Sequence, residues 1–130
     1  MPWSGEKNGG FTTGTPWIGA NPNYPRVNAE AELADPDSVF NYYKKLIALR
    51  HANPIIVYGT FHPLMEDSDV IYAYDRRLDG KTLRVLCNFS DRIQLCALAD
   101  TKPKNLLISN YRAKTVGLLR PYEAQAFFVE

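Results

Sequence analysis

The side chains best suited to acid–base chemistry in this sequence are its 14 aspartates and glutamates. Hydrolysis by a carboxyl pair, as in glycosidases, needs two such groups aimed at one bond from opposite sides. Asp35 and Asp37 stand where a helix would begin, and Asp79 precedes a glycine in a predicted turn. No acid follows a buried parallel strand, which is where a (β/α)8 barrel carries its catalytic groups. Capping or solvent exposure explains each acid better than catalysis, so we predict no catalytic residue in this chain.

Other reactive side chains also lack the partners that their chemistry requires. Acyl transfer needs a nucleophile with a base in reach, but no Gly-x-Ser-x-Gly elbow occurs, and His51 and His62 have no suggestive neighbours. The glycine-rich run at residues 9–14 lacks the lysine of a phosphate-binding loop. Cys87 and Cys96 are too few for a disulfide framework or a zinc site, so we expect two structural thiols on neighbouring strands. We therefore predict neither a metal nor a cofactor.

Aromatic residues among the first 34 positions are the remaining candidates for ligand binding. Trp3, Trp17 and Tyr24 lie among glycines and prolines, in a segment whose aromatic content is too high for a disordered tail. Aromatic faces suit the apolar C–H groups of a pyranose ring, so stacking on a sugar is one interpretation. Anchoring of the segment against a protein surface is the favoured interpretation. Both are open at this point, and these three residues are the candidate substrate-binding residues.

The overall composition is that of an ordinary soluble domain, and it excludes two classes of partner. Hydrophobic residues make up 45% and charged residues 22% of the 130 positions, and the net charge is +1. Because no basic stripe is available to neutralise phosphates, nucleic acid is excluded as a main partner. The longest apolar runs have four or five residues, far fewer than a membrane span requires. No signal-peptide pattern occurs, so we expect a cytoplasmic protein.

Residues 1–34 are expected to form a long irregular loop, because glycines and prolines recur there without a period of 2 or 3.6. One helix is predicted over residues 36–52. Asp35 suits its N-cap, Pro36 suits its first position, and Pro54 stands beyond its end. The apolar stripe of this helix needs a partner, either the β segment that follows or something upstream.

From residue 55 onward the hydrophobic pattern has a period of two, which predicts strands. The Asp79-Gly80 pair is a strong signal for a two-residue hairpin turn. Val70, Tyr72 and Tyr74 are expected to share one face of a strand. Seven short strands with brief connections favour an antiparallel sandwich or barrel. They are predicted at residues 55–58, 60–64, 70–75, 83–89, 93–98, 105–108 and 124–129.

Several motifs along the whole chain are very similar to those of one enzyme family. Among them are Met1-Pro2-Trp3-Ser4, Gly10-Phe11-Thr12-Thr13-Gly14-Thr15-Pro16-Trp17-Ile18, Asn21-Pro22-Asn23-Tyr24, Asp35-Pro36-Asp37-Ser38-Val39-Phe40 and Leu119-Arg120-Pro121-Tyr122-Glu123-Ala124. The sequence resembles the oligo-1,6-glucosidases of the α-amylase superfamily. The motifs of the first segment are the most specific, and those of the β segment alone are weaker.

The resemblance implies the layout of a larger enzyme, whose (β/α)8 barrel carries the catalytic acids upstream. Residues 1–53 would be a remnant of that barrel, with the loop after its eighth strand at 1–34 and its last helix at about 36–52. Residues 54–130 would be the C-terminal antiparallel β domain. The expected fold class is therefore mainly β: an antiparallel β-sandwich preceded by one α-helix and a long irregular loop left over from the barrel.

The resemblance further implies the C-terminal segment of a retaining α-glucosidase acting on α-1,6-linked gluco-oligosaccharides. The chain alone would be inactive, and its partners would be the missing barrel and, in the full enzyme, an oligosaccharide at a pocket rim that includes Trp3, Trp17 and Tyr24. The family usually has Met-Gln-Trp-Asp at residues 1–4, so the substrate is open among isomaltose-type sugars, dextran ends, trehalose 6-phosphate and sucrose. A non-catalytic carbohydrate-binding β module is the alternative, and self-association through the exposed helix face is a third possibility.

Overall fold

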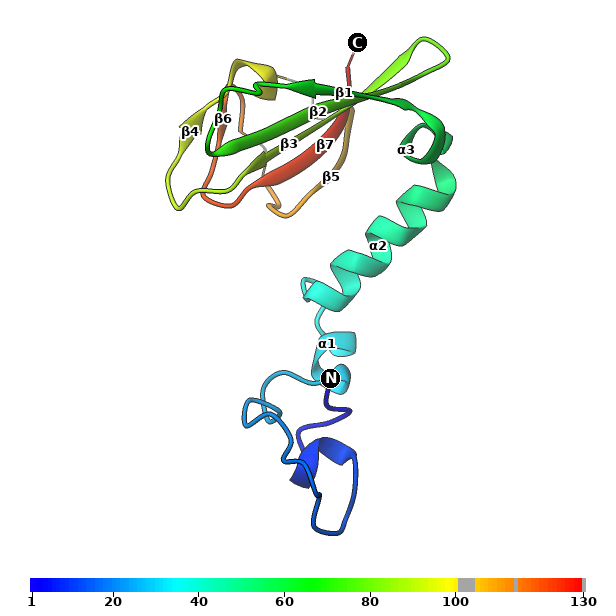
Figure 1. Cartoon of the computed structure of the whole chain (residues 1–130), viewed down its shortest axis with the longest axis vertical. Coiled ribbons are helices and arrows are strands. Elements are labelled where there is room, and N and C mark those ends of the chain that lie inside the picture. The colour runs from blue at the N-terminus through cyan, green and yellow to red at the C-terminus, as the bar shows by residue number, and fades with distance from the viewer. Residues whose placement is uncertain (101–104, 114, 130) are drawn as a thin grey trace. The chain divides into compact units, whose positions relative to one another are not determined.

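The chain folds into two compact units, Met1–His51 and Ala52–Glu130 (Figure 1). The computed structural model describes residues 1–100, 105–113 and 115–129. The first unit consists of loops and helices, and the strands found in the described residues belong to the second. The expected order, a loop and helix followed by antiparallel β structure, is therefore confirmed.

The first unit contains a helix that the sequence analysis missed, α1 (Ala29–Ala34). Asn28 caps it, because its Oδ1 accepts a hydrogen bond from the backbone N of Ala31 at 2.9 Å. Alanine and glutamate have high helix propensity, so the run AEAELA is helical although the segment before it is not. The expectation of an irregular loop throughout residues 1–34 is thus wrong at its end. A short 3-10 helix, η1 (Lys7–Gly10), also interrupts that loop.

The long helix α2 (Val39–Ala52) is present, and it begins later than predicted. Ser38 takes the capping role, because its Oγ accepts a hydrogen bond from the backbone N of Asn41 at 3.2 Å. Asp35 does not cap this helix; its Oδ1 accepts a hydrogen bond from the backbone N of Asp37 at 2.9 Å and closes a turn ahead of the helix. The end of α2 agrees with the prediction.

A short helix, α3 (Pro54–Tyr58), replaces the strand predicted at residues 55–58. β-branched residues favour a strand there, but Pro54 lies in the first turn, where its fixed φ suits a helix. Gly59 follows the helix at a position where a Cβ would lie 2.5 Å from the carbonyl oxygen of Ile55. The close approach of the backbone at Gly59 allows the chain to leave the helix and enter the first strand.

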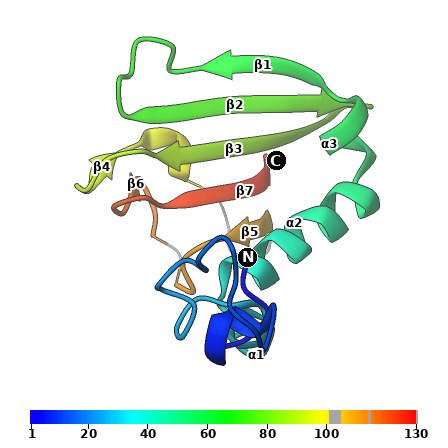
Figure 2. The same cartoon turned by 60° about the horizontal axis from the view of Figure 1, so that its bottom comes forward.

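The second unit contains two antiparallel sheets (Figures 1 and 2). A five-stranded sheet has the order β1-β2-β3-β7-β5, and a smaller sheet pairs β4 with β6. The strands are β1 (Thr60–Leu64), β2 (Ile71–Leu78), β3 (Lys81–Asn88), β4 (Gln94–Leu95), β5 (Leu106–Ser109), β6 (Leu118–Leu119) and β7 (Ala124–Val129). Among the described residues these strands form a five-stranded and a two-stranded antiparallel sheet and not a closed barrel.

The strand predictions hold best where the local signals are strong. The Asp79-Gly80 hairpin turn is confirmed, with φ values of 49° and 73° that match a type I′ turn. The strand expected at residues 93–98 shortens to β4, because the 3-10 helix η2 (Ala97–Ala99) takes its second half. The two-residue strand β6 was not predicted, since two residues are too few to show a period of two.

The core of the second unit lies between the five-stranded sheet and the segment that carries β4, η2 and β6. Its buried members are Ile71, Ala73, Leu86, Cys96, Ala99, Leu119 and Phe127. Tyr72 and Tyr74 share the opposite face of β2, with ring centroids 5.6 Å apart, whereas Val70 precedes the strand and packs against the core. Both cysteines are free thiols; Cys96 is 2% exposed and follows β4, and Cys87 is half-buried on β3.

Candidate functional site

The first residues of the chain are held between η1 and α1 by backbone hydrogen bonds. The backbone N of Trp3 donates to the carbonyl oxygen of Gly9 at 2.8 Å. On the other side, the backbone N atoms of Ala29 and Glu30 donate to the carbonyls of Pro2 and Trp3 at 2.9 and 3.0 Å. The segment is therefore an ordered loop whose shape is fixed by the main chain and not by a hydrophobic core.

Trp3 makes a ring contact inside this loop. Its ring meets that of Phe11 edge to face, with centroids 6.5 Å apart and an interplanar angle of 67°. Trp3 is still 64% exposed, so the contact covers only part of the indole. Anchoring and a free face for a ligand are therefore both compatible with its position.

Trp17 lines a hollow of about 420 Å³ in the same unit and is 94% exposed. Aromatic, proline and threonine side chains form much of the wall of this hollow. The residues that line it are Asn8, Phe11, Thr12, Thr15, Pro16, Trp17, Ile18 and Ala20. The side chain of Asn8 holds this loop together, because its Nδ2 donates to the carbonyls of Thr12 and Gly14 at 2.9 Å each. An exposed aromatic ring beside hydroxyl groups is an arrangement that can bind a sugar.

The third predicted residue, Tyr24, has a different environment. It is half-buried and is not among the residues lining this hollow. Its carbonyl oxygen accepts a hydrogen bond from Asn28 Nδ2 at 2.8 Å, which ties the Tyr24 turn to the start of α1. The residue that sequence reasoning missed is Phe11, which contacts Trp3 and lines the hollow with Trp17. An aromatic residue directly after Gly9-Gly10 was the available signal.

A second hollow in the first unit, of about 610 Å³, is a groove along α2. Its lining is almost entirely apolar and consists of Met1, Val27, Glu32, Val39, Phe40, Tyr43, Lys44 and Ile47. Several apolar side chains of α2 are open to solvent in this chain: Val39 is 80% and Tyr43 65% exposed. The helix thus presents the apolar stripe that the sequence pattern indicated.

The acids do not form a pair in any of three hollows formed by described residues. The α2 groove contains one, Glu32, and the hollow around Trp17 contains none. A third hollow, of about 420 Å³ at one end of β2, contains Asp69 alone among acids. Within the described part of the chain, no three His, Cys, Asp or Glu residues come together as a metal site would require.

Among the described residues, Asp75 is one of two deeply buried acids, with a side chain 1% exposed. Its Oδ1 accepts a hydrogen bond from Arg84 Nε at 2.8 Å, and its Oδ2 accepts one from Arg84 Nη2 at 3.0 Å and one from Arg77 Nη2 at 3.4 Å. Burial by itself would raise the pKa of Asp75, but the hydrogen bonds and charges of Arg84 and Arg77 prevail and lower it. Both oxygens of this carboxylate are engaged, so its role is structural.

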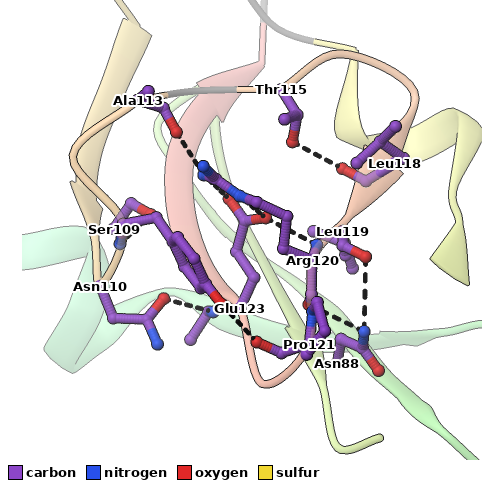
Figure 3. Close-up of polar contacts among 12 residues, drawn as sticks. Asn88, Ser109, Asn110, Ala113, Thr115, Leu118, Leu119, Arg120, Pro121 and Glu123 are labelled. Atoms are coloured by element: carbon purple, nitrogen blue, oxygen red, sulfur yellow. Dashed lines mark hydrogen bonds and ion pairs between the residues drawn. The ribbon is translucent and has the colours of Figure 1, made fainter. Parts of the chain in front are cut away.

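The other buried acid, Glu123, is bound in the same way by Arg120 (Figure 3). Its Oε2 accepts hydrogen bonds from the backbone N and the Nε of Arg120 at 2.8 and 3.0 Å, and its Oε1 accepts one from Nη2 at 3.0 Å. Arg120 Nη2 also donates to the carbonyl of Ala113. The guanidinium lies 3.9 Å from the ring centroid of Tyr111, whose hydroxyl donates to the carbonyl of Pro121 at 2.8 Å. This cluster ties the turn before β7 to the segment after β5.

Comparison with known proteins finds relatives along nearly the whole chain. The sequence profile of the family described as Alpha amylase, catalytic domain, matches residues 1–59. The oligo-1,6-glucosidase of Parageobacillus thermoglucosidasius is 47% identical over 135 aligned residues, which cover 98% of this chain and 24% of that protein. The chain is similar to about a quarter of the length of the oligo-1,6-glucosidases and, over its residues 1–59, to the catalytic domain of the α-amylases.

Proteins with other named activities are also similar to the chain. The trehalose-6-phosphate hydrolase of Escherichia coli K12 is 41% identical over 95% of this chain and 23% of its own length. The crystal structure of isomaltulose synthase from Klebsiella sp. LX3 superposes with a TM-score of 0.90 at 34% identity, covering 100% of this chain and 24% of that one. The chain thus spans about a quarter of the length of the curated relatives that it matches.

The described helices include none long and apolar enough to cross a membrane.

Proposed function

We propose that the chain serves as the C-terminal segment of a retaining α-glucosidase that hydrolyses α-1,6-linked gluco-oligosaccharides. The observation that carries the proposal is the 47% identity to an oligo-1,6-glucosidase along 98% of the chain. The aligned quarter supplies no carboxyl pair in the hollows described above, so the chain alone is inactive. The catalytic acids then belong to the three quarters of the relatives that lie outside the alignment.

In this proposal the two units have different tasks. Residues 1–53 complete the catalytic barrel, with the loop at 1–34 on the rim of its pocket and α2 as its last helix, and residues 54–130 form a β-sandwich domain that stabilises the barrel. The match of the catalytic-domain profile to residues 1–59 supports a boundary close to residue 54. The exposed Trp17 with its hollow supports the assignment of the first segment to the rim.

The groove along α2 supports the barrel as a partner of this segment. A helix whose stripe includes Val39 and Tyr43, both mostly exposed, is stable in water only when something covers that stripe. In the full enzyme the neighbouring barrel elements cover it. In the isolated chain we expect self-association through the same face, and light scattering that shows a monomer at all concentrations would argue against it.

The test is a chimera in which this chain replaces the matching quarter of the Parageobacillus thermoglucosidasius oligo-1,6-glucosidase. We expect the chimera to release glucose from isomaltose, whereas the isolated chain releases none above a buffer blank. Turnover by the isolated chain would contradict the proposal. Assays of the same chimera with trehalose 6-phosphate and sucrose address the substrate, because Pro2 and Ser4 depart from the usual family motif and alter the polar groups near Trp3.

One observation favours a second candidate function, a non-catalytic carbohydrate-binding module. Trp17 is almost fully exposed beside hydroxyl-bearing side chains, which is the arrangement of a surface sugar site. This function predicts that the isolated chain binds an oligosaccharide such as isomaltotriose, and that Trp17→Ala weakens the binding. Calorimetric titration without heat change would exclude it.

A further inference from the structure

Asn8 and Gly9 form a pair that is prone to a spontaneous reaction of the main chain. Among the asparagines of the sequence, Asn8 alone is followed by glycine. Glycine has no side chain to shield its backbone N, and it adopts almost any φ and ψ once the chain opens. The backbone N of such a glycine can attack the side-chain amide carbon of the asparagine before it. The pair is therefore a candidate site of deamidation.

This reaction needs no enzyme, and water is its only other reactant. The backbone N of Gly9 forms a bond to Cγ of Asn8 while the bond from Cγ to Nδ2 breaks. Nδ2 leaves as ammonia with the proton that the Gly9 amide gives up, and a cyclic imide remains. Water then opens the imide at either carbonyl, so residue 8 becomes an aspartate or an isoaspartate. Each product has a carboxylate in place of the amide.

The folded loop opposes the first step of this reaction. Asn8 has φ of 59° and ψ of 21°, in the left-handed region that asparagine tolerates. At this ψ the backbone N of Gly9 does not eclipse Cβ of Asn8, as closure of the imide ring requires. The same N donates to the carbonyl of Glu6 at 2.9 Å, and Nδ2, the leaving group, donates to two carbonyls. The reaction therefore requires the loop to open first.

Little buried surface holds this loop, residues 7–14, in its closed form; we name it the Asn8 loop. Asn8 itself is half-buried, and Phe11 is 53% exposed. The buried hydrophobic residues found in the described part of the chain belong to the second unit. Segments held mainly by hydrogen bonds, with few buried apolar contacts, open locally without unfolding of the remainder. We therefore expect the Asn8 loop to open far more often than the β unit unfolds.

We propose that Asn8 is a deamidation site whose rate is set by opening of the Asn8 loop, and that its modification loosens the wall of the hollow around Trp17. In the native loop, Nδ2 of Asn8 donates to the carbonyls of Thr12 and Gly14 at 2.9 Å each. A carboxylate only accepts hydrogen bonds, so in either product both carbonyls lose a donor and face a negative charge. Asn8 and Thr12 both line the hollow, so the change occurs in its wall.

The rate of deamidation in folded and unfolded chain tests the control by loop opening. The whole chain is incubated at neutral pH, and peptide mapping by mass spectrometry measures the conversion at residue 8. We expect the reaction to be at least about tenfold slower in the native chain than in guanidinium chloride at the same pH, because attack requires the open loop. Equal rates in the two states, or no reaction at Asn8 in the unfolded chain, would overturn the proposal.

A pair of threonine variants tests whether this particular loop is the one that opens. Thr12→Ala removes the hydroxyl that accepts a hydrogen bond from the backbone N of Gly14 at 3.1 Å. In the native chain it should speed deamidation about threefold, because a lost hydrogen bond of this kind makes opening easier. Thr13→Ala changes an exposed neighbour and should leave the rate unchanged. Equal native rates for the two variants would contradict control by the Asn8 loop.

The structural consequence is tested by Asn8→Asp, which reproduces one product directly. Tryptophan fluorescence during urea titration reports on the first unit, and we expect the midpoint to move to lower urea. The control is Asn21→Asp, which adds the same charge. Oδ1 of Asn21 accepts a hydrogen bond from the backbone N of Asn23 at 3.1 Å, and a carboxylate accepts it equally well, so this midpoint should not move. Equal midpoints for the two variants would mean that the amide of Asn8 does not hold the loop.

These experiments are independent of the proposed function, because none of them measures the hydrolysis of a sugar. A chimera without activity would leave the deamidation site unaffected. Conversely, failure of the folded chain to protect Asn8 would overturn the inference and leave the proposed function as it stands.

Discussion

Asp75 on β2 and Arg84 on β3 face each other across the sheet, and two hydrogen bonds of 2.8 and 3.0 Å join the carboxylate to the guanidinium. Asp75→Asn removes the negative charge and leaves Arg84, with a side chain 18% exposed, without its ion partner. We expect the free energy of unfolding to fall by about 3 kcal/mol, because removing one partner of a buried ion pair leaves the other charge buried and unpaired. Urea titration followed by circular dichroism measures the change.

The matched control is Asp91→Asn. Asp91 and Arg92 form a pair of 4.0 Å in which both side chains are mostly exposed. Such surface pairs contribute little, so we expect a change of no more than about 0.5 kcal/mol. Equal losses in the two variants would mean that burial does not strengthen the Asp75 pair.

The same pair predicts how stability depends on pH. The pKa of Asp75 is lowered in the folded chain, so the unfolded chain takes up a proton first as the pH falls. The stabilisation from this group is complete above the ordinary aspartate pKa of about 3.9 and is lost as the pH falls through the folded pKa. Urea titrations between neutral and acid pH should show a steeper acid loss for the native chain than for Asp75→Asn. An unchanged slope in the variant would assign the acid sensitivity to other groups.

The sequence predicted the secondary structure correctly where the local pattern favoured a single structure. Asp79-Gly80 permits the two positive φ values of a type I′ turn, and the hairpin forms there. At residues 55–58 the local signals conflict. The side chains favour a strand, but the proline before them favours the start of a helix, and the structure has a helix there. Strand β6 depends on pairing with β4, a contact between residues far apart in sequence that no local pattern encodes.

The candidate site was less accessible to sequence reasoning. As exposed aromatic residue types in a loop, Trp3 and Trp17 indicated ligand binding. The sequence could not show that Phe11 contacts Trp3 and also lines the Trp17 hollow, or that Tyr24 does not line it. These relations follow from main-chain hydrogen bonds such as the one between the N of Trp3 and the carbonyl of Gly9, which have no side-chain signature.

Gly9 provides a test of how this loop keeps its shape. It is buried with φ of 65°, and an added Cβ would lie 2.8 Å from the Cβ of Pro2. Gly9→Ala should destabilise the first unit by about 2 kcal/mol, because a left-handed conformation and a clash act together. Both tryptophans of the chain, Trp3 and Trp17, lie in this unit, so tryptophan fluorescence during urea titration reports on it.

Gly19→Ala is the control for that experiment. A Cβ at Gly19 meets nothing within 4 Å, and no positive φ is required there. We expect this variant to be neutral or slightly stabilising, because alanine restricts the unfolded chain. A loss as large as that of Gly9→Ala would mean that the loop responds to any substitution and not to the particular geometry at Gly9.

Tyr111 makes two separable contributions to the cluster around Arg120. Tyr111→Phe removes the hydroxyl bond to Pro121 and keeps the ring under the guanidinium, so we expect a loss of about 1 kcal/mol in the free energy of unfolding. Tyr111→Leu removes the ring as well and should cost about 1 kcal/mol more, through the lost cation–π contact and packing. Urea titration of both variants separates the contribution of the hydroxyl group from that of the ring. Equal losses in the free energy of unfolding would show that the ring itself contributes nothing.

Trp3 and Trp17 separate the two roles proposed for the aromatic residues of the first unit. Trp3→Ala should lower stability by about 1 kcal/mol, because it removes the edge-to-face contact with Phe11. Trp17 is 94% exposed, so Trp17→Ala should change the free energy of unfolding by less than about 0.5 kcal/mol. In the chimera, however, Trp17→Ala should raise KM for isomaltose while kcat stays nearly constant, as expected for a residue that binds substrate away from the reacting bond. A stability loss matching that of Trp3→Ala, with KM unchanged, would make Trp17 an anchor as well and remove it from the substrate-binding residues.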